Sequence, residues 1–165
     1  MKTLLIIRHA KSSWDSASMP DISRPLNDRG KKDAPAMARR LISAGILIDR
    51  FVSSPARRAK ETAEAFAHVS GRKSKDIEFV TDLYHALPPV FKQVIGSLDD
   101  KDDTVALFAH NPGITTFANM LTAVRVDNMP TCSVFAVQSP AEHWKEFLTA
   151  GPEFLFFHYP KEPTD

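Results

Sequence analysis

Cysteine is nearly absent from this sequence of 165 residues. Cys132 is the single one, so no disulfide can form within the chain, which is typical of proteins from a reducing compartment. Long apolar runs are lacking too, because the run that opens the chain, Leu4 to Ile7, spans only four residues. A signal peptide or a membrane span needs a longer run. We therefore expect a cytoplasmic protein.

The sequence also carries almost no net charge. Its 21 lysine and arginine residues and 20 aspartate and glutamate residues leave a formal net charge of +1 at pH 7. Nucleic acids and anionic membranes attract strongly basic proteins, so this balance favours neither as a partner. The composition is otherwise that of an ordinary globular protein, and the length suits one domain, which we place at residues 1–165.

Several common phosphate-transfer and metal motifs are missing. The chain contains no Walker A sequence, G-x-x-x-x-G-K-[ST], and no H-E-x-x-H pair, so we expect no metal site. A cysteine-dependent phosphatase needs an arginine at the position where Gln138 follows Cys132. The stretch DKDDT, from Asp100 to Thr104, matches a pattern of aspartate-nucleophile phosphatases. Because it precedes its predicted strand, at the wrong edge of the sheet, we interpret it as a solvated turn.

Apolar runs alternate with helix-like stretches along the chain, which predicts a layered α/β architecture. The predicted strands cover residues 4–7, 48–54, 77–80, 103–109, 132–137 and 154–159. Helices are predicted over residues 27–44 and after the prolines at positions 55, 88 and 112. Pro35 predicts a kink or a broken first half in the first helix. We expect a three-layer α/β/α sandwich whose mixed, mostly parallel central sheet has an antiparallel late strand.

Three predicted strand-to-helix junctions carry the same kinds of side chain. Imidazole rings, guanidinium groups and hydroxyls follow three strands: Arg8 and His9, then Ser53, Ser54, Arg57 and Arg58, then His110 and Asn111. Ligands of parallel α/β sheets bind beyond the carboxyl ends of the strands, so these junctions converge if their strands are neighbours. Together with helix N-termini they would form a trap for a small, doubly charged anion, for which phosphate is the obvious candidate.

Histidine in a phosphate pocket can act as a nucleophile. A neutral imidazole carries a lone pair that can attack phosphorus, and histidine is a recognised covalent nucleophile. Adjacent arginines disfavour the protonated ring and would neutralise charge on the phosphoryl oxygens in the transition state. For Arg8 alone, a surface ion pair with Asp15 or Asp21 would be the simpler interpretation. However, histidines and a further arginine stand at the ends of two other strands, at positions equivalent to that of Arg8. This pattern favours a catalytic role for Arg8 over a surface ion pair.

The sequence contains, in order, four stretches that resemble the motif set of the histidine phosphatase superfamily: LLIIRHAKSSW, RPLNDRG, SSPARRAKET and FAHNPG. It is most similar to the branch of short, single-domain proteins around the phosphohistidine phosphatase SixA. The resemblance implies a phosphoglycerate mutase-like fold and a metal-independent hydrolase, without a cofactor, that acts through a phosphohistidine enzyme intermediate. Its partner would be a phosphorylated substrate, and phosphohistidine on signalling proteins is the expected one.

The resemblance also implies roles for individual residues. His9 would be the nucleophile that accepts the phosphoryl group, within a charged pocket completed by Arg8, Arg58 and His110. The motif places its arginine directly before an alanine, which selects Arg58 over Arg57. Substrate binding is expected of two polar neighbours of these residues, Ser12 and Asn111.

Two features depart from the family pattern. Ala10 stands where a glycine usually follows the first histidine, and no carboxylate is obvious as the proton donor. His85 lies about where the donor would fall, and Asp82 is nearby. A weak or missing acid suits a leaving group that departs easily, such as imidazole, which favours a phosphohistidine substrate. Three alternatives stay open: a phosphatase of small phosphate esters, a phosphoglycerate mutase-like phosphotransferase and a non-catalytic phosphate-binding module.

Overall fold

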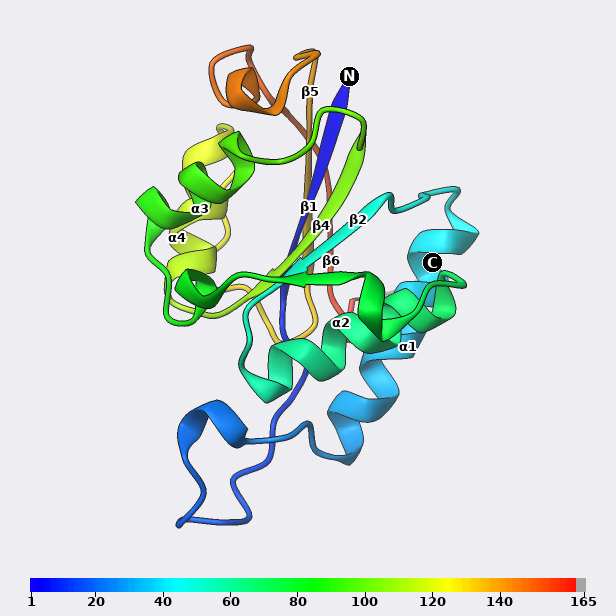
Figure 1. The fold of residues 1–165 in the computed structure, drawn as a ribbon, viewed down its shortest axis with the longest axis vertical. Coiled ribbons are helices and arrows are strands. Elements are labelled where there is room, and N and C mark those ends of the chain that lie inside the picture. Colours follow the sequence, from blue (N-terminus) through cyan, green and yellow to red (C-terminus); the bar gives the residue numbers. More distant parts are fainter. Residues whose placement is uncertain (163–165) are drawn as a thin grey trace.

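The computed structural model describes residues 1–162 of the chain. Six strands form one sheet (Figure 1): β1 (Lys2–Arg8), β2 (Arg50–Ser53), β3 (Ile77–Phe79), β4 (Thr104–Ala109), β5 (Val134–Ser139) and β6 (Glu153–His158). The α-helices are α1 (Asp28–Ser43), α2 (Arg57–Val69), α3 (Pro88–Gly96) and α4 (Gly113–Leu121). Short 3-10 helices join them: η1 (Asp21–Ser23), η2 (Ser74–Asp76), η3 (Thr81–Leu83) and η4 (Trp144–Glu146). Each predicted strand and helix is present, with bounds that differ by a few residues.

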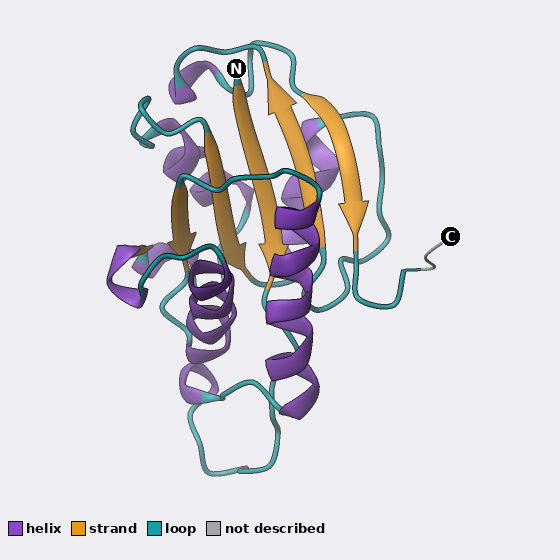
Figure 2. Ribbon diagram, turned by 90° about the vertical axis from the view of Figure 1, so that its right-hand side faces the viewer, coloured by secondary structure: helices purple, strands orange, loops and turns teal. Residues whose placement is uncertain are grey.

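The strands are ordered β3-β2-β4-β1-β5-β6 in the sheet (Figure 2). β1, β2, β3 and β4 run parallel, whereas β5 is antiparallel to β1, and β6 is antiparallel to β5. The predicted mixed sheet with an antiparallel late strand is therefore confirmed. β1 lies inside the sheet between β4 and β5, which explains why its sequence is a continuous apolar run.

Helices cover both faces of the sheet, with α3 and α4 on one side and α1 and α2 on the other (Figure 1). Along β1, Leu4 and Ile6 pack into the core beneath α3 and α4, while Leu5 and Ile7 pack into the core beneath α1 and α2. This alternation follows from the two-residue repeat of a strand. All four side chains are fully buried. The predicted three-layer architecture is confirmed.

α1 is continuous across Pro35, so the break, one of the two outcomes expected from the sequence besides a kink, is absent. At its start, the Asn27 side chain accepts a hydrogen bond of 2.9 Å from the Gly30 backbone N–H and caps the helix. Further along, one face of the helix buries four apolar side chains, those of Ala34, Met37, Ala38 and Leu41. Burial of this face offsets the backbone hydrogen bond that Pro35 removes.

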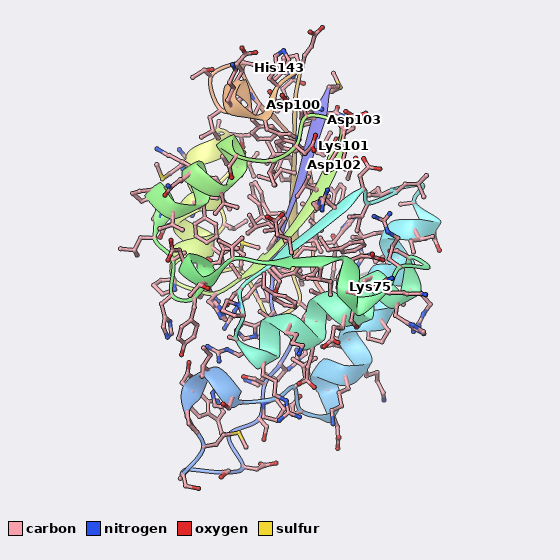
Figure 3. The ribbon with its side chains drawn as sticks, viewed as in Figure 1. Lys75, Asp100, Lys101, Asp102, Asp103 and His143 are labelled. Atoms are coloured by element: carbon pink, nitrogen blue, oxygen red, sulfur yellow. The ribbon has the colours of Figure 1, made fainter. Side chains whose placement is uncertain are left out.

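The turn from Asp100 to Asp103 lies at the amino end of β4, next to the start of β1 (Figure 3). Asp100, Lys101 and Asp103 are exposed, as expected of a solvated turn, whereas Asp102 is an exception because it is only 7% exposed. Its carboxylate accepts a hydrogen bond from Arg50 Nε at 3.0 Å, and its carbonyl oxygen accepts one from Trp144 Nε1 at 2.7 Å. The turn is therefore a structural joint at the end of the sheet that lies opposite the carboxyl ends of the parallel strands.

Candidate active site

The polar junctions meet at the carboxyl ends of neighbouring strands. β4 lies between β1 and β2, and its register places Ala109 beside Arg8. The next residues of the two strands, His9 and His110, are therefore neighbours, with ring centroids 5.2 Å apart. Ser54, which follows β2, lies against His110, with its hydroxyl oxygen 2.7 Å from His110 Nε2. The convergence expected from the sequence is present in the fold.

His9 is buried, and its ring has a defined orientation. Its Nδ1 lies 2.7 Å from the Ala10 carbonyl oxygen. A carbonyl oxygen can only accept a hydrogen bond, so Nδ1 carries the proton and Nε2 carries the lone pair of the neutral ring. Burial, followed by the charges of Arg58 and Arg8, lowers the pKa of His9 to about 3. The ring is therefore neutral at neutral pH, and the lone pair on its Nε2 atom can attack an electrophile.

His110 is buried beside His9 and is neutral for similar reasons. Burial is the largest cause that lowers its pKa to about 2, and the neighbouring His9 and Arg58 add to it. When the Ser54 hydroxyl donates to Nε2, the proton of the neutral ring resides on Nδ1, which is buried without a hydrogen-bond partner. His110 can thus donate a hydrogen bond from Nδ1 to an anion in the site.

Arg8 and Arg58 are each held through the terminal Nη atoms of the guanidinium group. Arg8 donates from Nη1 to the Met129 carbonyl oxygen at 2.8 Å, and Arg58 donates from Nη1 and Nη2 to Asp21 at 2.8 and 3.0 Å. In both arginines, the Nε atom is buried without a partner. Within residues 1–162, the other such side-chain atoms are His110 Nδ1 and one serine hydroxyl. Because buried donors rarely lack a partner, these groups fit an anion that accepts hydrogen bonds from them.

Asp21 belongs to this site through Arg58, although the sequence suggested it only as a surface ion-pair partner of Arg8. Its carboxylate accepts hydrogen bonds from Arg58, from the Tyr84 hydroxyl at 2.5 Å and from Arg24 Nε at 3.1 Å. Burial alone would raise the pKa of Asp21, but the hydrogen bonds of Tyr84 and Arg58 outweigh burial and lower this pKa to about 2. The carboxylate is therefore a permanent anion that anchors Arg58. No spacing pattern marks Asp21 or Tyr84, since their segments meet only in the folded chain.

His85 stands at the mouth of the site. Its side chain is 60% exposed, and its Nε2 lies 3.7 Å from Asp21 Oδ2. Its ring centroid is 6.0 Å from that of His110, so an exposed imidazole lies next to a buried one. Asp82, the other donor considered, is exposed on η3.

Two residues expected to bind substrate have other contacts in the structure. The Asn111 amide nitrogen donates to Asn128 Oδ1 at 2.8 Å and to the Met129 carbonyl oxygen at 3.2 Å. Ser12 is buried where its backbone forms an antiparallel bridge with Leu26. Both residues therefore fix chain segments around the site, and neither shares the hydrogen bonds of the two histidines.

Burial distinguishes the two adjacent arginines of α2. Arg58 is 3% exposed and contributes to the site, as described above. Arg57 points to the surface, where its Nε lies 3.7 Å from Glu61 Oε1. The structure thus brings together Arg8, His9, Arg58 and His110 and leaves Arg57 outside.

The charges of the site suit an anion. Guanidinium groups next to neutral imidazole rings would repel a metal cation and attract a phosphoryl group. Among residues 1–162, no three histidine, cysteine or acidic side chains are grouped so that they could hold a metal ion. In the same part of the chain, every helix is too short or too polar to cross a membrane.

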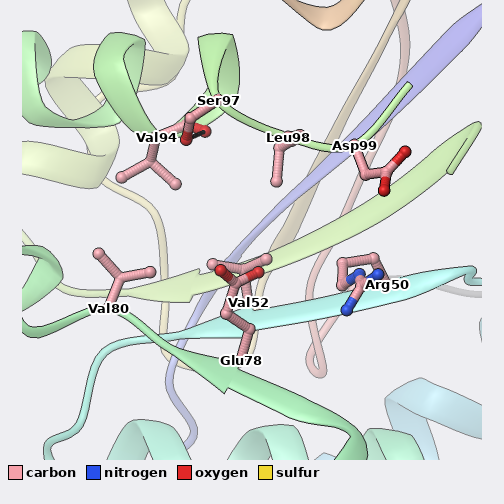
Figure 4. A pocket seen from close by; sticks show the side chains of 8 residues that line it. All are labelled: Arg50, Val52, Glu78, Val80, Val94, Ser97, Leu98 and Asp99. Atoms are coloured by element: carbon pink, nitrogen blue, oxygen red, sulfur yellow. Dashed lines mark hydrogen bonds between the residues drawn. The ribbon is translucent and has the colours of Figure 1, made fainter. Parts of the chain in front are cut away.

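A separate cavity of about 280 Å³ opens where α3 faces the edge of the sheet formed by β2 and β3 (Figure 4). Arg50 and Asp99 lie toward one end of it, and Val80 and Val94 lie toward the other. The hydrogen bond to Asp102 is the main cause that raises the pKa of Arg50, and further carboxylates that include Asp99 contribute. The positive charge of Arg50, the one guanidinium group that lines this cavity, is therefore already compensated by carboxylates. In this respect the cavity differs from the anion site.

Sequence comparisons agree with the site. A family model described as the histidine phosphatase superfamily (branch 1) matches residues 4–84, a range that includes Arg8, His9 and Arg58. An uncharacterized chloroplastic protein of Arabidopsis thaliana is 31% identical over 160 residues, which cover 92% of this chain and 73% of the relative. The likeness to this relative therefore extends over nearly the whole fold.

Solved structures share the architecture. The protein histidine phosphatase SixA complexed with tungstate aligns with a TM-score of 0.80 at 21% identity, over 96% of this chain and 97% of that one. Mycobacterial glucosyl-3-phosphoglycerate phosphatase aligns with a TM-score of 0.64 at 17% identity, over 93% of this chain and 96% of that one. The expected phosphoglycerate mutase-like α/β fold is thus confirmed. By its matched motifs, its relatives and its fold, the chain belongs to the histidine phosphatase superfamily.

Proposed function

We propose that this protein is a metal-independent phosphatase that acts through a phosphohistidine formed on His9. Its superfamily supports phosphatase activity. One observation carries the proposal: the neutral, buried ring of His9 lies beside Arg8 and Arg58, whose Nε atoms are buried without a partner. Residues 1–165 would act as a single histidine-phosphatase-like domain.

In the first step, the Nε2 lone pair of His9 attacks phosphorus, and the bond between phosphorus and the leaving group breaks, so that the leaving group departs with the bonding electron pair. The unpaired donors of Arg8, Arg58 and His110 bind the phosphoryl oxygens while negative charge is spread over them. Because these donors are buried and already oriented, they need little rearrangement when the reaction occurs.

In the second step, a water molecule attacks the phosphorus atom of phospho-His9, and the bond between phosphorus and nitrogen breaks. Inorganic phosphate leaves, and the ring returns to its neutral form with the proton still on Nδ1. The proton released by the attacking water passes to a base at the mouth, for which His85 is placed.

The proton donor decides which leaving groups the site can release. Asp21 is unsuited to this task because its pKa of about 2 keeps it ionised. His85 and Asp82 are exposed to solvent, and neither donates a hydrogen bond to the buried histidines of the site within residues 1–162. A leaving imidazole needs less help from an acid than an alkoxide does. We therefore propose phosphohistidine on signalling proteins as the substrate.

Turnover of an aryl phosphate tests the enzymatic part of the proposal. His9→Ala should abolish phosphate release, since no other side chain of the site offers a lone pair in the same position. His68→Ala is the matched control, because His68 is exposed on α2. Undiminished turnover in His9→Ala would contradict a nucleophilic role, and a wild-type protein that binds phosphate without turnover would be a binding module.

A substrate panel tests the finer part. A phosphohistidine protein should exceed small phosphate esters in kcat/KM by more than about tenfold, which corresponds to ~1.4 kcal/mol in transition-state stabilisation. A preference for small esters would instead identify a metabolite phosphatase. Transfer of the phosphoryl group to a second phosphoglycerate molecule, in place of water, would identify a mutase.

A further inference from the structure

Arg8 is oriented by a carbonyl group from outside the charged pocket. Its Nη1 donates to the Met129 carbonyl oxygen at 2.8 Å, while its Nε stays without a partner. Met129 lies in the segment between α4 and β5 and is fully buried. A long arginine side chain has many rotamers, so the direction of the guanidinium group depends on what holds Met129 in place.

Two side chains form hydrogen bonds with the backbone of Met129, one with its N–H group and one with its carbonyl oxygen. Thr115 Oγ1, on α4, accepts a hydrogen bond from the Met129 N–H at 3.0 Å. Asn111 Nδ2, just before α4, donates to the Met129 carbonyl oxygen at 3.2 Å. The Thr115 hydroxyl in turn donates to Asn111 Oδ1 at 2.5 Å. These bonds close a ring through three residues that faces Arg8.

We propose that Thr115 is a positioning residue of the phosphoryl pocket, which orients Arg8 through Asn111 and the Met129 carbonyl group. This proposal rests on the proposed function, because it assigns Arg8 to phosphoryl binding. It also gives Asn111 a different role from the one expected from the sequence. Its amide holds the pocket in shape, since both ends of the amide are engaged within the ring.

The ring requires a hydroxyl at position 115. One oxygen atom must accept from the Met129 N–H and donate to Asn111 at the same time, which serine can do and valine cannot. Valine has a similar shape, so it leaves the packing of α4 largely intact. It would leave the buried Met129 N–H without a partner, and the Asn111 amide would be held through Nδ2 alone. A shift of about 1 Å in a positioned group can cost on the order of a hundredfold in rate.

Tungstate binding, measured by calorimetry, tests the proposal without requiring turnover. Thr115→Val should weaken tungstate binding by about tenfold, and Thr115→Ser should restore it to within about twofold of wild type. Thr116→Val is the matched control. Thr116 is the adjacent threonine, it is exposed, and its hydroxyl donates to the Pro112 carbonyl oxygen alone at 3.2 Å. Its variant should bind tungstate like wild type.

A double-mutant cycle separates positioning from general loosening of the fold. In an Arg8→Ala background, Thr115→Val should cause no further loss of tungstate affinity, because the group that it orients is gone. Equal losses in both backgrounds would overturn the proposal, and so would wild-type affinity in Thr115→Val. Thr115→Ala undergoes the same cycle if the valine variant does not fold. If Thr115 and Arg8 are coupled in tungstate binding but the protein turns over no phosphorylated substrate, only the proposed phosphatase function is overturned.

Discussion

At the scale of residues, the site consists of groups that the fold keeps in one charge state. Burial makes His9 and His110 neutral, with pKa values lowered to about 3 and about 2. Direct hydrogen bonds keep Asp21 ionised. The pocket thus combines neutral rings with fixed cations, which is the combination that a histidine nucleophile for phosphate needs.

The neutral histidines predict a loss of stability in acid. Their ordinary pKa of 6.5 applies in the unfolded chain, whereas folding lowers both values far below it. Between pH 6 and pH 4 the unfolded chain therefore binds more protons than the folded one, so the free energy of unfolding falls as the pH falls. Each histidine contributes at most about 1.4 kcal/mol per pH unit.

Urea unfolding at a series of pH values between 7 and 4 measures this slope. His110→Asn should show a shallower dependence than wild type, because it removes one of the two groups. His68→Asn, at an exposed position, should keep the wild-type slope. The same slope in His110→Asn and wild type would show that His110 is not held neutral by the fold.

The anchor of Arg58 predicts a catalytic effect outside the motifs. Asp21→Asn removes the charge that holds Arg58 Nη2 at 3.0 Å, while the backbone carbonyl of residue 21 still accepts from Nη1. We expect kcat/KM to fall by about tenfold, or ~1.4 kcal/mol. Asp15→Asn, exposed on the same loop, is the control. Unchanged kcat/KM in Asp21→Asn would rule out the anchoring role.

At the scale of elements, periodicity and proline signals were sufficient to place every strand and α-helix of residues 1–162, because each has a buried face or a marked start. The exception is Pro35, where the burial of Met37 and its neighbours keeps α1 continuous. The short helices η1 and η3 have no period to detect. They bring Asp21 and Tyr84 together, so this half of the site could not be predicted from spacing.

Gly113, at the start of α4, packs closely against the segment that carries Tyr84 and His85, so a larger residue there should affect both stability and activity. A Cβ atom added at Gly113 would lie 1.8 Å from the Ala86 carbonyl oxygen, which is backbone and cannot move alone. Gly113→Ala should therefore destabilise the protein by about 1–3 kcal/mol. It should also lower kcat/KM, since the displaced segment carries Tyr84 and His85.

Gly96→Ala serves as the control for this substitution, because a Cβ atom at Gly96 on α3 would meet nothing within 4 Å. We expect it to raise the free energy of unfolding by about 0.4–1 kcal/mol. Thermal and urea unfolding measure both variants. A Gly113→Ala protein as stable as wild type would mean that the contact with the 81–88 segment is not tight.

At the scale of the whole molecule, the proposed catalytic groups and the buried Asp102 lie at opposite ends of the sheet. His9 and His110 follow the carboxyl ends of β1 and β4, and Asp102 forms hydrogen bonds with Arg50 and Trp144 at the amino ends. The separation was predictable from the sequence, because Asp102 precedes its strand and His110 follows it. The burial of Asp102 was not, since its partners are distant along the chain.

This separation predicts a variant that loses stability and keeps its activity. Asp102→Ala leaves Arg50 without the carboxylate that accepts its hydrogen bond. The Asp102 side chain is only 10% exposed in wild type. We expect a loss of about 1–3 kcal/mol in the free energy of unfolding. The value of kcat/KM at a temperature where the variant is folded should equal that of wild type. A matching loss in kcat/KM would show that the two ends are coupled.

The central claim is that His9 Nε2 carries the phosphoryl group. Trapping with a radiolabelled phosphodonor, followed by peptide mapping and NMR of the linkage, tests it most directly. We expect an acid-labile, base-stable phosphoryl group on Nε2 of His9, because Nδ1 is engaged with the Ala10 carbonyl oxygen. It should be absent in His9→Ala and retained in His68→Ala. A phosphoryl group on any other residue, or full phosphate release from His9→Ala, would contradict the account.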